Sequence, residues 1–172
     1  VITFTGRLIP EKGLPSLLNV MKRINTEIDD VYLFIAGDGP MWEEIQKEKN
    51  NRIIPLGRID FEHIVHLLDE SDIFCLPSFS EGFSTSILEA IACKCYILTT
   101  ARGGAKEILI DDTYGTIIEN NAEELLYPAL KEAILNTEMR SIGIEKAYNK
   151  LCNGFTWDVA SKKLEQIFDE EV

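Results

Sequence analysis

Short apolar runs alternate with amphipathic stretches over the first two thirds of the chain. The apolar runs have the length and the β-branched and aromatic content of buried strands. They lie at 1–5, 31–36, 52–56, 73–76, 95–99 and 115–118. Between them, apolar residues recur every three or four positions, which is the period of a helix that buries one face. Helices are therefore predicted at 14–28, 41–49, 61–70, 84–93 and 104–109.

The repeated order of strand and helix predicts an α/β fold: a doubly wound, mostly parallel, Rossmann-like sheet with helices on both faces. Ligands of such sheets bind in the crevice at the carboxyl ends of the strands. After residue 118 the pattern becomes wholly helical, with predicted helices at 122–136, 139–151 and 157–170. The last of these is amphipathic, so its apolar face is expected to cover another surface.

Two glutamates stand eight positions apart where a strand passes through a loop into a helix. Glu81 lies in the loop, and Glu89 is expected in the second turn of the helix, roughly 7 Å further along its axis. The free N–H groups of Gly82, Phe83 and Ser84 lie between them. A helix N-terminus stabilises an anion, and carboxylates accept hydrogen bonds from hydroxyls. The array therefore suits an anion with a polyol at each end, which is the layout of a nucleotide diphosphate sugar.

A simpler interpretation of the same pair is a solvated glutamate beside a helix-capping glutamate. For an isolated pair of acids this interpretation has the better prior, because acidic side chains are almost always exposed. The functional interpretation therefore depends on what the neighbouring strand ends carry.

The first strand is followed by a turn that carries two cations, Arg7 and Lys12. Arg7 follows the strand directly and Lys12 precedes the first helix, so both are expected to point into the crevice where the loop of Glu81 opens. Arginine grips a phosphate with two parallel hydrogen bonds, and lysine adds a mobile point charge. Together they would neutralise a diphosphate without a metal ion. A solvated charged turn is the alternative, and the position of this turn favours the phosphate site.

Three further turns follow strands. The Gly-Asp-Gly-Pro turn at 37–40 is interpreted as structural: its proline is expected at the first position of a helix, and the dinucleotide-binding fingerprint is incomplete. Arg58 and Ile59 in the third turn would offer groups to a base, although Arg58 also fits a surface cation. In the fourth turn Gly103 and Gly104 permit a close backbone approach to a ligand.

Composition excludes several classes of protein. At 172 residues the chain fits one domain that needs no disulfide framework. The four cysteines lack zinc-ribbon and redox spacing and are expected to be reduced core thiols of a cytosolic protein. Seventeen basic and 29 acidic residues give a net charge of −12, which disfavours binding to nucleic acid or to anionic lipid. No apolar run approaches the roughly 20 residues of a membrane-spanning helix, and no signal peptide is visible.

With these motifs in their order, the chain resembles the donor-binding C-terminal domain of the retaining glycosyltransferases of the two-domain GT-B fold, the glycosyl transferases group 1. The resemblance covers nearly the whole chain, and several ordered motifs at family spacing make it specific. It rests on Gly6-Arg7 to Lys12-Gly13, Ala36 to Pro40, Leu56-Gly57, Pro77-Ser78 to Glu81-Gly82-Phe83 with Glu89-Ala90, Gly103-Gly104 and Glu107-Ile108.

The resemblance implies a role for each motif. Arg7 and Lys12 would bind the donor diphosphate and stabilise the charge that develops on the leaving nucleotide, and Glu81 would hold hydroxyls of the transferred sugar. Glu89 would accept hydrogen bonds from the ribose hydroxyls. The implied donor-binding set is completed by Gly6, Gly82, Phe83, Ser84, Thr85, Arg58, Ile59, Gly103 and Gly104. The family transfers a sugar with retention of its anomeric configuration and needs no bound metal. No cofactor is therefore expected besides the nucleotide sugar, which is the substrate.

Two departures from the family pattern bear on the site. Ser84 stands where the family often has a second glycine, which narrows backbone freedom and brings a hydroxyl to the phosphate site. Lys94-Cys95-Tyr96 replaces the usual Gly-x-Pro before the next strand, so the exit of the helix is expected to be altered. The fold is expected to survive both changes.

The family also has an N-terminal Rossmann-like domain that binds the acceptor, and this chain has no room for it. Residues 1–151 are expected to form the donor domain, and 152–172 a C-terminal helix that crosses toward the missing domain. The start at Val1, without a methionine, suggests a piece of a longer protein. The piece alone is expected to bind donor weakly and to turn over little. The whole enzyme is expected to be cytoplasmic, to act in glycan, polysaccharide or lipid-linked assembly, and to associate peripherally with a membrane through its other half.

Other functions remain open. A sugar-nucleotide epimerase of the same architecture would bind the same nucleotide without transfer to an acceptor, and a non-catalytic scaffold would bind none. A receiver domain shares the alternating pattern, but its acidic pair would follow the first strand, whereas Asp29 and Asp30 precede the second. His63 and His66 stand three apart on a predicted helix, and without further ligands they are interpreted as surface residues.

Overall fold

A single parallel sheet with the strand order β3-β2-β1-β4-β5-β6 runs through the computed structural model, which describes residues 1–170. This confirms the predicted doubly wound α/β class. The strands are β1 Ile2–Thr5, β2 Leu33–Ala36, β3 Ile53–Gly57, β4 Ile73–Leu76, β5 Tyr96–Thr100 and β6 Thr116–Ile118.

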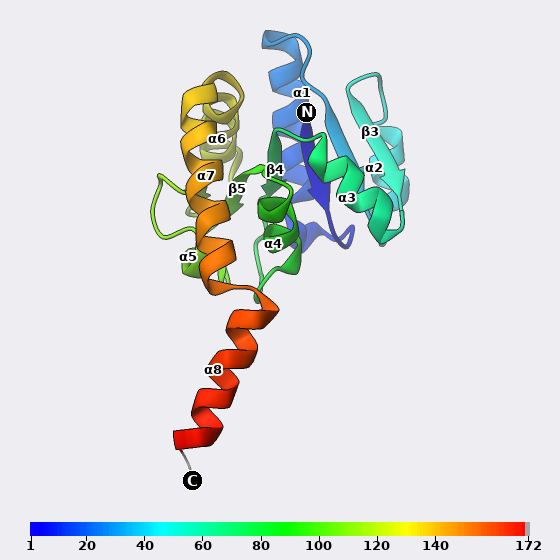
Figure 1. The fold of residues 1–172 in the computed structure, drawn as a ribbon. Coiled ribbons are helices and arrows are strands. Elements are labelled where there is room, and N and C mark those ends of the chain that lie inside the picture. The colour runs from blue at the N-terminus through cyan, green and yellow to red at the C-terminus, as the bar shows by residue number, and fades with distance from the viewer. Residues whose placement is uncertain (171–172) are drawn as a thin grey trace.

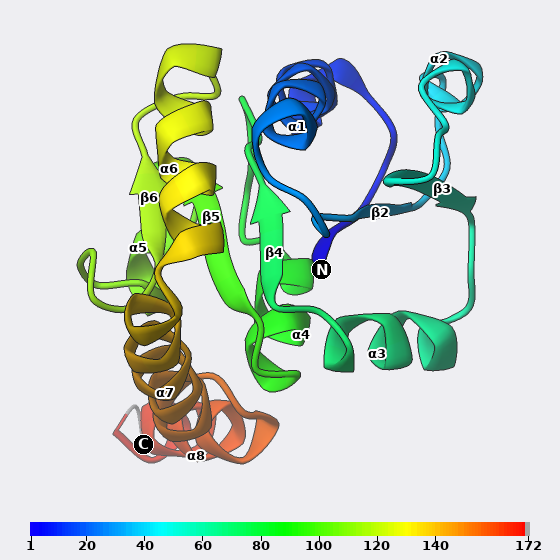
Figure 2. The same cartoon turned by 90° about the horizontal axis from the view of Figure 1, so that it is seen from above.

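Helices cover both faces of the sheet (Figure 2). α1 and α6 pack together on one face, while α3 and α4 lie on the other face, where α4 packs against α7. The helices are α1 Leu14–Glu27, α2 Trp42–Lys47, α3 Phe61–Asp69, α4 Thr85–Ala92, α5 Ala105–Ile108, α6 Glu123–Leu135, α7 Thr137–Gly154 and α8 Trp157–Glu170, with a short 3-10 helix, η1, at Pro10–Lys12.

Burial on both faces explains why the strands are continuously apolar. Every residue of β1, β4 and β5 is buried, as expected of central strands in a parallel sheet. The chain leaves β1 toward β2 on one side and later returns beside β1 as β4, so the strand order reverses between β1 and β4. A crevice for a ligand is expected at the carboxyl ends of these two strands.

The bounds of the predicted elements agree with the structure within two residues, except that α7 ends at Gly154, three residues beyond the predicted 151. The start of α2 also differs from the expectation in one detail. The sequence pattern placed the proline of the 37–40 turn at the first helical position, but the helix begins two residues later, at Trp42. The reason is that the Met41 N–H donates to the Leu8 carbonyl and the Trp42 N–H donates to the Gly39 carbonyl. These bonds form a separate turn before the helix.

The exit of α4 shows what the replacement of the usual glycine does. Lys94 has a left-handed φ of 59°. The Cys95 N–H donates to the Ala90 carbonyl over 2.9 Å and the Lys94 N–H to the Ile91 carbonyl over 3.0 Å, which is the Schellman pattern of a helix end. That pattern needs a left-handed residue after the helix, so the backbone exit is preserved and Lys94 carries the strain.

Replacing Lys94 with glycine is therefore expected to stabilise the domain by about 0.5–1 kcal/mol. Glycine removes the left-handed strain, which outweighs the loss of the Lys94 ammonium over the Tyr148 ring, 5.3 Å from its centroid. Urea unfolding of Lys94→Gly against Lys94→Ala measures the difference, because alanine loses the same cation and keeps the strain. Equal midpoints for the two variants would contradict this reasoning.

Tyr96 occupies the position where the family usually has proline, and the structure makes room for it. Its ring lies against Gly143 of α7, where an added Cβ would come within 2.6 Å of the ring. Its hydroxyl is hydrogen-bonded to Thr116 Oγ1 over 2.8 Å. The large side chain is thus buried with its polar atom satisfied, and the fold survives the substitution as expected.

The four cysteines are free, as the sequence predicted, but they are not all core residues. Cys75 and Cys95 are buried and Cys93 is half-buried. Burial raises the pKa of Cys93 to about 11 and that of Cys95 to about 12, so both are thiols at neutral pH. The expectation of a core thiol is wrong for Cys152, because it faces solvent from α7.

The last helix, α8, projects away from the body of the domain (Figure 1). Its bounds match the predicted helix at 157–170, and four of its large apolar side chains are exposed: Trp157 at 91%, Leu164, Ile167 and Phe168. Over residues 1–170, no helix is both long and apolar enough to cross a membrane. The predicted domain division at 151 and the crossing of α8 toward another domain stay predictions, and the final two residues of that segment lie outside the described residues.

Candidate functional site

The turn after β1 is anchored by one buried residue, Leu8. Leu8 is fully buried, its N–H donates to the Asp38 carbonyl over 2.9 Å, and its carbonyl accepts from Met41. Arg7, directly before it, is exposed at the carboxyl edge of the sheet. The sequence therefore fixes the backbone of this turn while leaving the Arg7 guanidinium free to meet a ligand.

Lys12 and Glu81 form an ion pair in the structure. Lys12 Nζ contacts Glu81 Oε1, which also accepts a hydrogen bond from Ser78 Oγ over 2.9 Å. The side chains of Lys12 and Glu81 are only 16% and 11% exposed. The Phe79 N–H donates to the Glu11 carbonyl, so the turn after β1 and the loop after β4 are also joined through their backbones. Residues 77–84 are called the Glu81 loop from here on.

A cavity of about 510 Å³ opens between this turn and the Glu81 loop. The three residues predicted to be catalytic all line it, although Glu81 lies about seventy positions along the chain from the two cations. Its full lining is Arg7, Ile9, Glu11, Lys12, Ser80, Glu81 and Gly82. The parallel sheet produces this convergence by bringing the ends of β1 and β4 to one edge.

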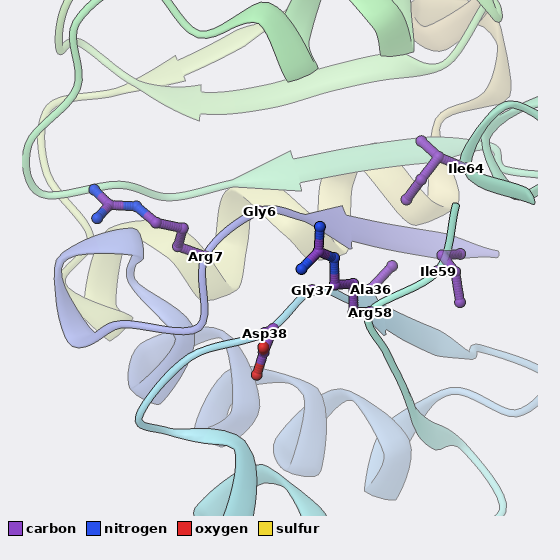
Figure 3. A pocket seen from close by; sticks show the side chains of 8 residues that line it. All are labelled: Gly6, Arg7, Ala36, Gly37, Asp38, Arg58, Ile59 and Ile64. Carbon is purple, nitrogen blue, oxygen red and sulfur yellow. The ribbon is translucent and has the colours of Figure 1, made fainter. Parts of the chain in front are cut away.

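A second cavity, of about 380 Å³, shares Arg7 with the first and lies at the ends of β1, β2 and β3. Figure 3 shows the Arg58 side chain extending toward Gly6 and Gly37, whereas the Arg7 side chain extends away from the end that Ile59 and Ile64 form. Its lining residues are Gly6, Arg7, Ala36, Gly37, Asp38, Arg58, Ile59 and Ile64.

Four of these residues were not among the candidates from the sequence: Ala36, Gly37, Asp38 and Ile64. The turn at 37–40 was interpreted as structural, and it does have that role, because a Cβ on Gly37 would lie 1.8 Å from the Gly6 carbonyl oxygen. Gly37 and Asp38 of this turn also line the cavity. The signal that would have identified them as site residues is that their turn follows a strand at the same edge of the sheet as Arg7.

The helix α4 begins one residue later than predicted. Ser84 is its N-cap and Thr85 its first residue, so Gly82 and Phe83 belong to the Glu81 loop and not to the helix. Ser84 Oγ is hydrogen-bonded to Ser86 Oγ over 2.9 Å instead of to a backbone N–H of the helix. Within residues 1–170 the backbone N–H groups of 82–84 have no hydrogen-bond partner, so they remain available as donors.

Glu89 lies in the second turn of α4, as the sequence predicted. It is half-buried, and burial raises the pKa of its carboxyl. It is not among the residues that line the two cavities. Its pairing with a ribose therefore stays a prediction.

Gly103 and Gly104 pack against the Glu81 loop. The Gly104 N–H donates to the Gly82 carbonyl over 3.0 Å, and a Cβ on Gly103 would lie 1.7 Å from that carbonyl oxygen. The close approach that these glycines permit is therefore an approach of the loop itself. Their contact with a donor stays a prediction.

The two histidines of α3 are both exposed. Asp60 caps this helix: its Oδ1 accepts from the His63 N–H over 3.0 Å and lies 2.6 Å from His63 Nδ1. These contacts raise the pKa of His63 and lower that of Asp60. Among the residues that the structure describes, no three His, Cys, Asp or Glu side chains are grouped to hold a metal ion.

Comparison with known sequences gives a family-level match. The model of the glycosyl transferases group 1 matches residues 1–150. An uncharacterized glycosyltransferase of Methanocaldococcus jannaschii, MJ1069, is 28% identical over 177 residues, and the match covers 99% of this chain and 45% of that protein. The chain spans less than half of the length of the curated relatives that it matches first.

Solved structures share the fold. The C-terminal domain of a group 1 glycosyl transferase (LpcC) from Francisella tularensis has a TM-score of 0.81 and 23% identity, over 91% of this chain and 86% of that domain. Anabaena Alr3699/HepE, solved in complex with UDP-glucose, has a TM-score of 0.85 and 19% identity, over 98% of this chain and 48% of that protein. These similarities show that the chain shares the fold of these domains.

Proposed function

Since the chain belongs to the glycosyl transferases group 1, we propose that it is the donor-binding half of a retaining, metal-independent glycosyltransferase. Its donor would be a nucleotide diphosphate sugar. The observation that carries the proposal is the convergence of Arg7, Lys12 and Glu81 on one cavity of about 510 Å³. The two cations match a diphosphate and the Glu81 carboxylate matches the sugar joined to it, while Glu11 is a second carboxylate of the lining.

The charges of the free site indicate how a donor would be held. Lys12 is already paired with Glu81, whereas Arg7 forms no ion pair within residues 1–170. A diphosphate would therefore accept hydrogen bonds from Arg7 and from the backbone N–H groups of 82–84, which have no partner within residues 1–170. Lys12 would reach the phosphate from its place beside Glu81. Catalysis would consist of positioning and of stabilising the charge on the departing nucleotide.

The second cavity offers a place for the base. It adjoins the first cavity at Arg7, which lines both. Ile59 and Ile64 form an apolar wall, and the Arg58 side chain extends over the cavity. A flat base with apolar faces and polar edges suits such a lining. HepE, which shares this fold, was solved with UDP-glucose, and that supports a nucleotide sugar as the ligand class.

The acceptor half would come from another part of the protein. We propose that a longer polypeptide carries an N-terminal domain that binds a glycan or lipid-linked acceptor, and that α8 crosses to it. The exposed apolar side chains of α8, Trp157 among them, support a surface that another domain covers. Unchanged packing and exposure of α8 in the longer protein would count against this part of the proposal.

Calorimetric titration of the chain with UDP, GDP and ADP in EDTA tests the donor site. The proposal predicts saturable one-to-one binding of one diphosphate without a divalent metal. Transfer to an acceptor by the longer protein, with the anomeric configuration of the product read by NMR, tests the reaction. Interconversion of the donor sugar without transfer would identify an epimerase instead. Absence of nucleotide binding by this chain alone would indicate a site that needs its other domain, and absence of binding by the longer protein as well would indicate a scaffold.

Acidification is expected to weaken nucleotide binding through Glu89. An ionised carboxylate accepts hydrogen bonds from ribose hydroxyls better than a neutral one, and burial raises the pKa of Glu89, so protonation begins at a higher pH than for an exposed glutamate. Affinity should fall about three- to tenfold as the pH drops through that raised pKa. The control is Glu89→Gln, whose side chain cannot ionise. The nucleotide phosphates titrate in the same way with both proteins, so a difference between the two pH profiles reports Glu89. Parallel pH profiles for the two proteins would contradict this role.

The same raised pKa has the opposite consequence for folding. The folded state binds the Glu89 proton more tightly than the unfolded chain, so ionisation costs stability as the pH rises from the unfolded pKa through the folded one. Glu89→Gln should therefore be slightly more stable than the unmodified chain at neutral pH, with the difference vanishing under acid. This separates a loss of binding from a loss of folding.

A further inference from the structure

An aromatic stack joins the Glu81 loop to the far end of α7. The rings of Phe83 and Phe155 lie 5.8 Å apart between centroids with an interplanar angle of 18°. Phe155 is the C-cap of α7, its N–H donates to the Leu151 carbonyl over 2.9 Å, and it packs against the core. The ring is therefore supported by a well-anchored helix end.

The Phe83 ring is also in contact with backbone. A Cβ on Gly104 would lie 2.2 Å from Phe83 Cδ2, so the ring rests directly on the glycine. The same glycine donates its N–H to the Gly82 carbonyl over 3.0 Å. Phe83 is thus in contact with both Gly104 and Phe155, and it lies between Gly82 and Ser84, whose carbonyls accept backbone hydrogen bonds from Gly104 and from Ile87.

Few other contacts fix this part of the loop. The N–H groups of 82–84 are without partners in residues 1–170, and Phe83 remains 44% exposed. Glu81 is held on the opposite side by Lys12 and Ser78. Ser84 is held by its own helix, because its carbonyl accepts from the Ile87 N–H over 3.2 Å and its Oγ is hydrogen-bonded to Ser86 Oγ. The placement of Gly82 and Phe83 therefore depends on the Gly104 hydrogen bond and on the aromatic stack.

We propose that Phe155 is a positioning residue of the donor site, which acts through the Phe83 ring to hold the N–H groups of 82–84 beside the cavity. This inference rests on the proposed donor-binding function. Phe155 itself lines neither of the two cavities, so its effect on a ligand is indirect. A preorganised loop binds more tightly because less conformational freedom is lost on binding, and the stack supplies that order.

Two measurements on the chain test this role. The first is calorimetry in EDTA with whichever of UDP, GDP and ADP binds the unmodified chain. It compares the affinities of Phe155→Ala, Phe155→Tyr and Met139→Ala for that nucleotide. Met139 is the matched control, because it is a partly buried residue near the other end of α7. The exchange rate of the Gly104 amide, measured by NMR, reports the attachment of the loop without any ligand, since this N–H bonds to Gly82.

We expect Phe155→Ala to weaken nucleotide binding about three- to tenfold, because the free energy of an aromatic pair corresponds to a change in affinity of that size. Exchange of the Gly104 amide should accelerate by a similar factor. Phe155→Tyr keeps the ring and should bind within twofold of the unmodified chain, and Met139→Ala should change neither quantity. Phe155→Leu replaces the alanine variant if the latter does not fold.

An unchanged Gly104 exchange rate in Phe155→Ala would overturn the inference, whatever the affinity does. An affinity loss of the same size in Met139→Ala would also overturn it, because the effect would then follow from stability. If neither this chain nor the longer protein binds any of the three diphosphates, the proposed function fails, and the Gly104 exchange rate still decides whether Phe155 positions the loop.

Discussion

Replacing Arg7 with alanine is expected to weaken binding of the preferred nucleoside diphosphate by roughly 10- to 150-fold. Hydrogen bonds to charged groups contribute about 1.5–3 kcal/mol, and Arg7 is shared by both cavities. Lys12 cannot compensate for its loss, because Glu81 already offsets the lysine charge. Calorimetric titration of Arg7→Ala beside the unmodified chain measures this effect.

Arg102→Ala is the matched control for the loss of one positive charge. Arg102 is also exposed and also follows a strand at this edge of the sheet, but it does not line the two cavities. Its removal should change the affinity less than threefold. Equal losses in the two variants would mean that the nucleotide responds to net charge and not to a site around Arg7.

Replacing Gly13 with alanine is expected to destabilise the domain by about 3 kcal/mol or more. Gly13 joins η1 to α1 with a φ of 76°, and an added Cβ would lie 1.9 Å from the Pro77 carbonyl oxygen. A left-handed alanine costs about 1–2 kcal/mol, and the overlap with a backbone atom forces the two segments apart as well. Urea unfolding followed by far-ultraviolet circular dichroism gives the change in the free energy of unfolding.

The displacement would also separate the partners of the ion pair, since Lys12 precedes Gly13 and the Glu81 loop begins at Pro77. Nucleotide binding of the folded fraction should therefore fall together with stability. Gly82→Ala is the control for stability, because a Cβ there meets no atom within 4 Å, and it should change the free energy of unfolding by less than about 0.5 kcal/mol. A Gly13→Ala variant as stable as Gly82→Ala would refute the steric argument.

The alternation of apolar runs and amphipathic helices was sufficient to predict the sheet. β4 and α8 have the predicted bounds, and the parallel order places Arg7, Lys12 and Glu81 at one edge, as expected. Local sequence carries this information because strand period, helix period and the right-handed crossover rule leave few arrangements.

Contacts between distant segments were not predictable in this way. No local pattern relates Lys12 to Glu81 as an ion pair, or Gly103 to the Gly82 carbonyl. The same holds for the stack of Phe83 on Phe155. These contacts depend on how loops that follow different strands pack against one another. A single sequence gives no distance between such loops.

The helix end at Lys94 shows an intermediate case. The sequence indicated that the exit of α4 is altered, because lysine replaces the usual glycine. The structure shows a preserved Schellman turn in which a lysine adopts the left-handed conformation. Propensity therefore identified the right position, but the backbone pattern of the fold outweighed the preference of the residue.

A crystal structure of this chain grown with its preferred nucleoside diphosphate, in EDTA, tests the central claim most directly. The account predicts phosphate oxygens within about 3 Å of the Arg7 guanidinium, of Lys12 Nζ and of at least one N–H of residues 82–84. The base should lie in the cavity bounded by Ile59 and Ile64. A nucleotide bound elsewhere on the sheet, or bound at this edge without contact to Arg7 and Lys12, would contradict the account.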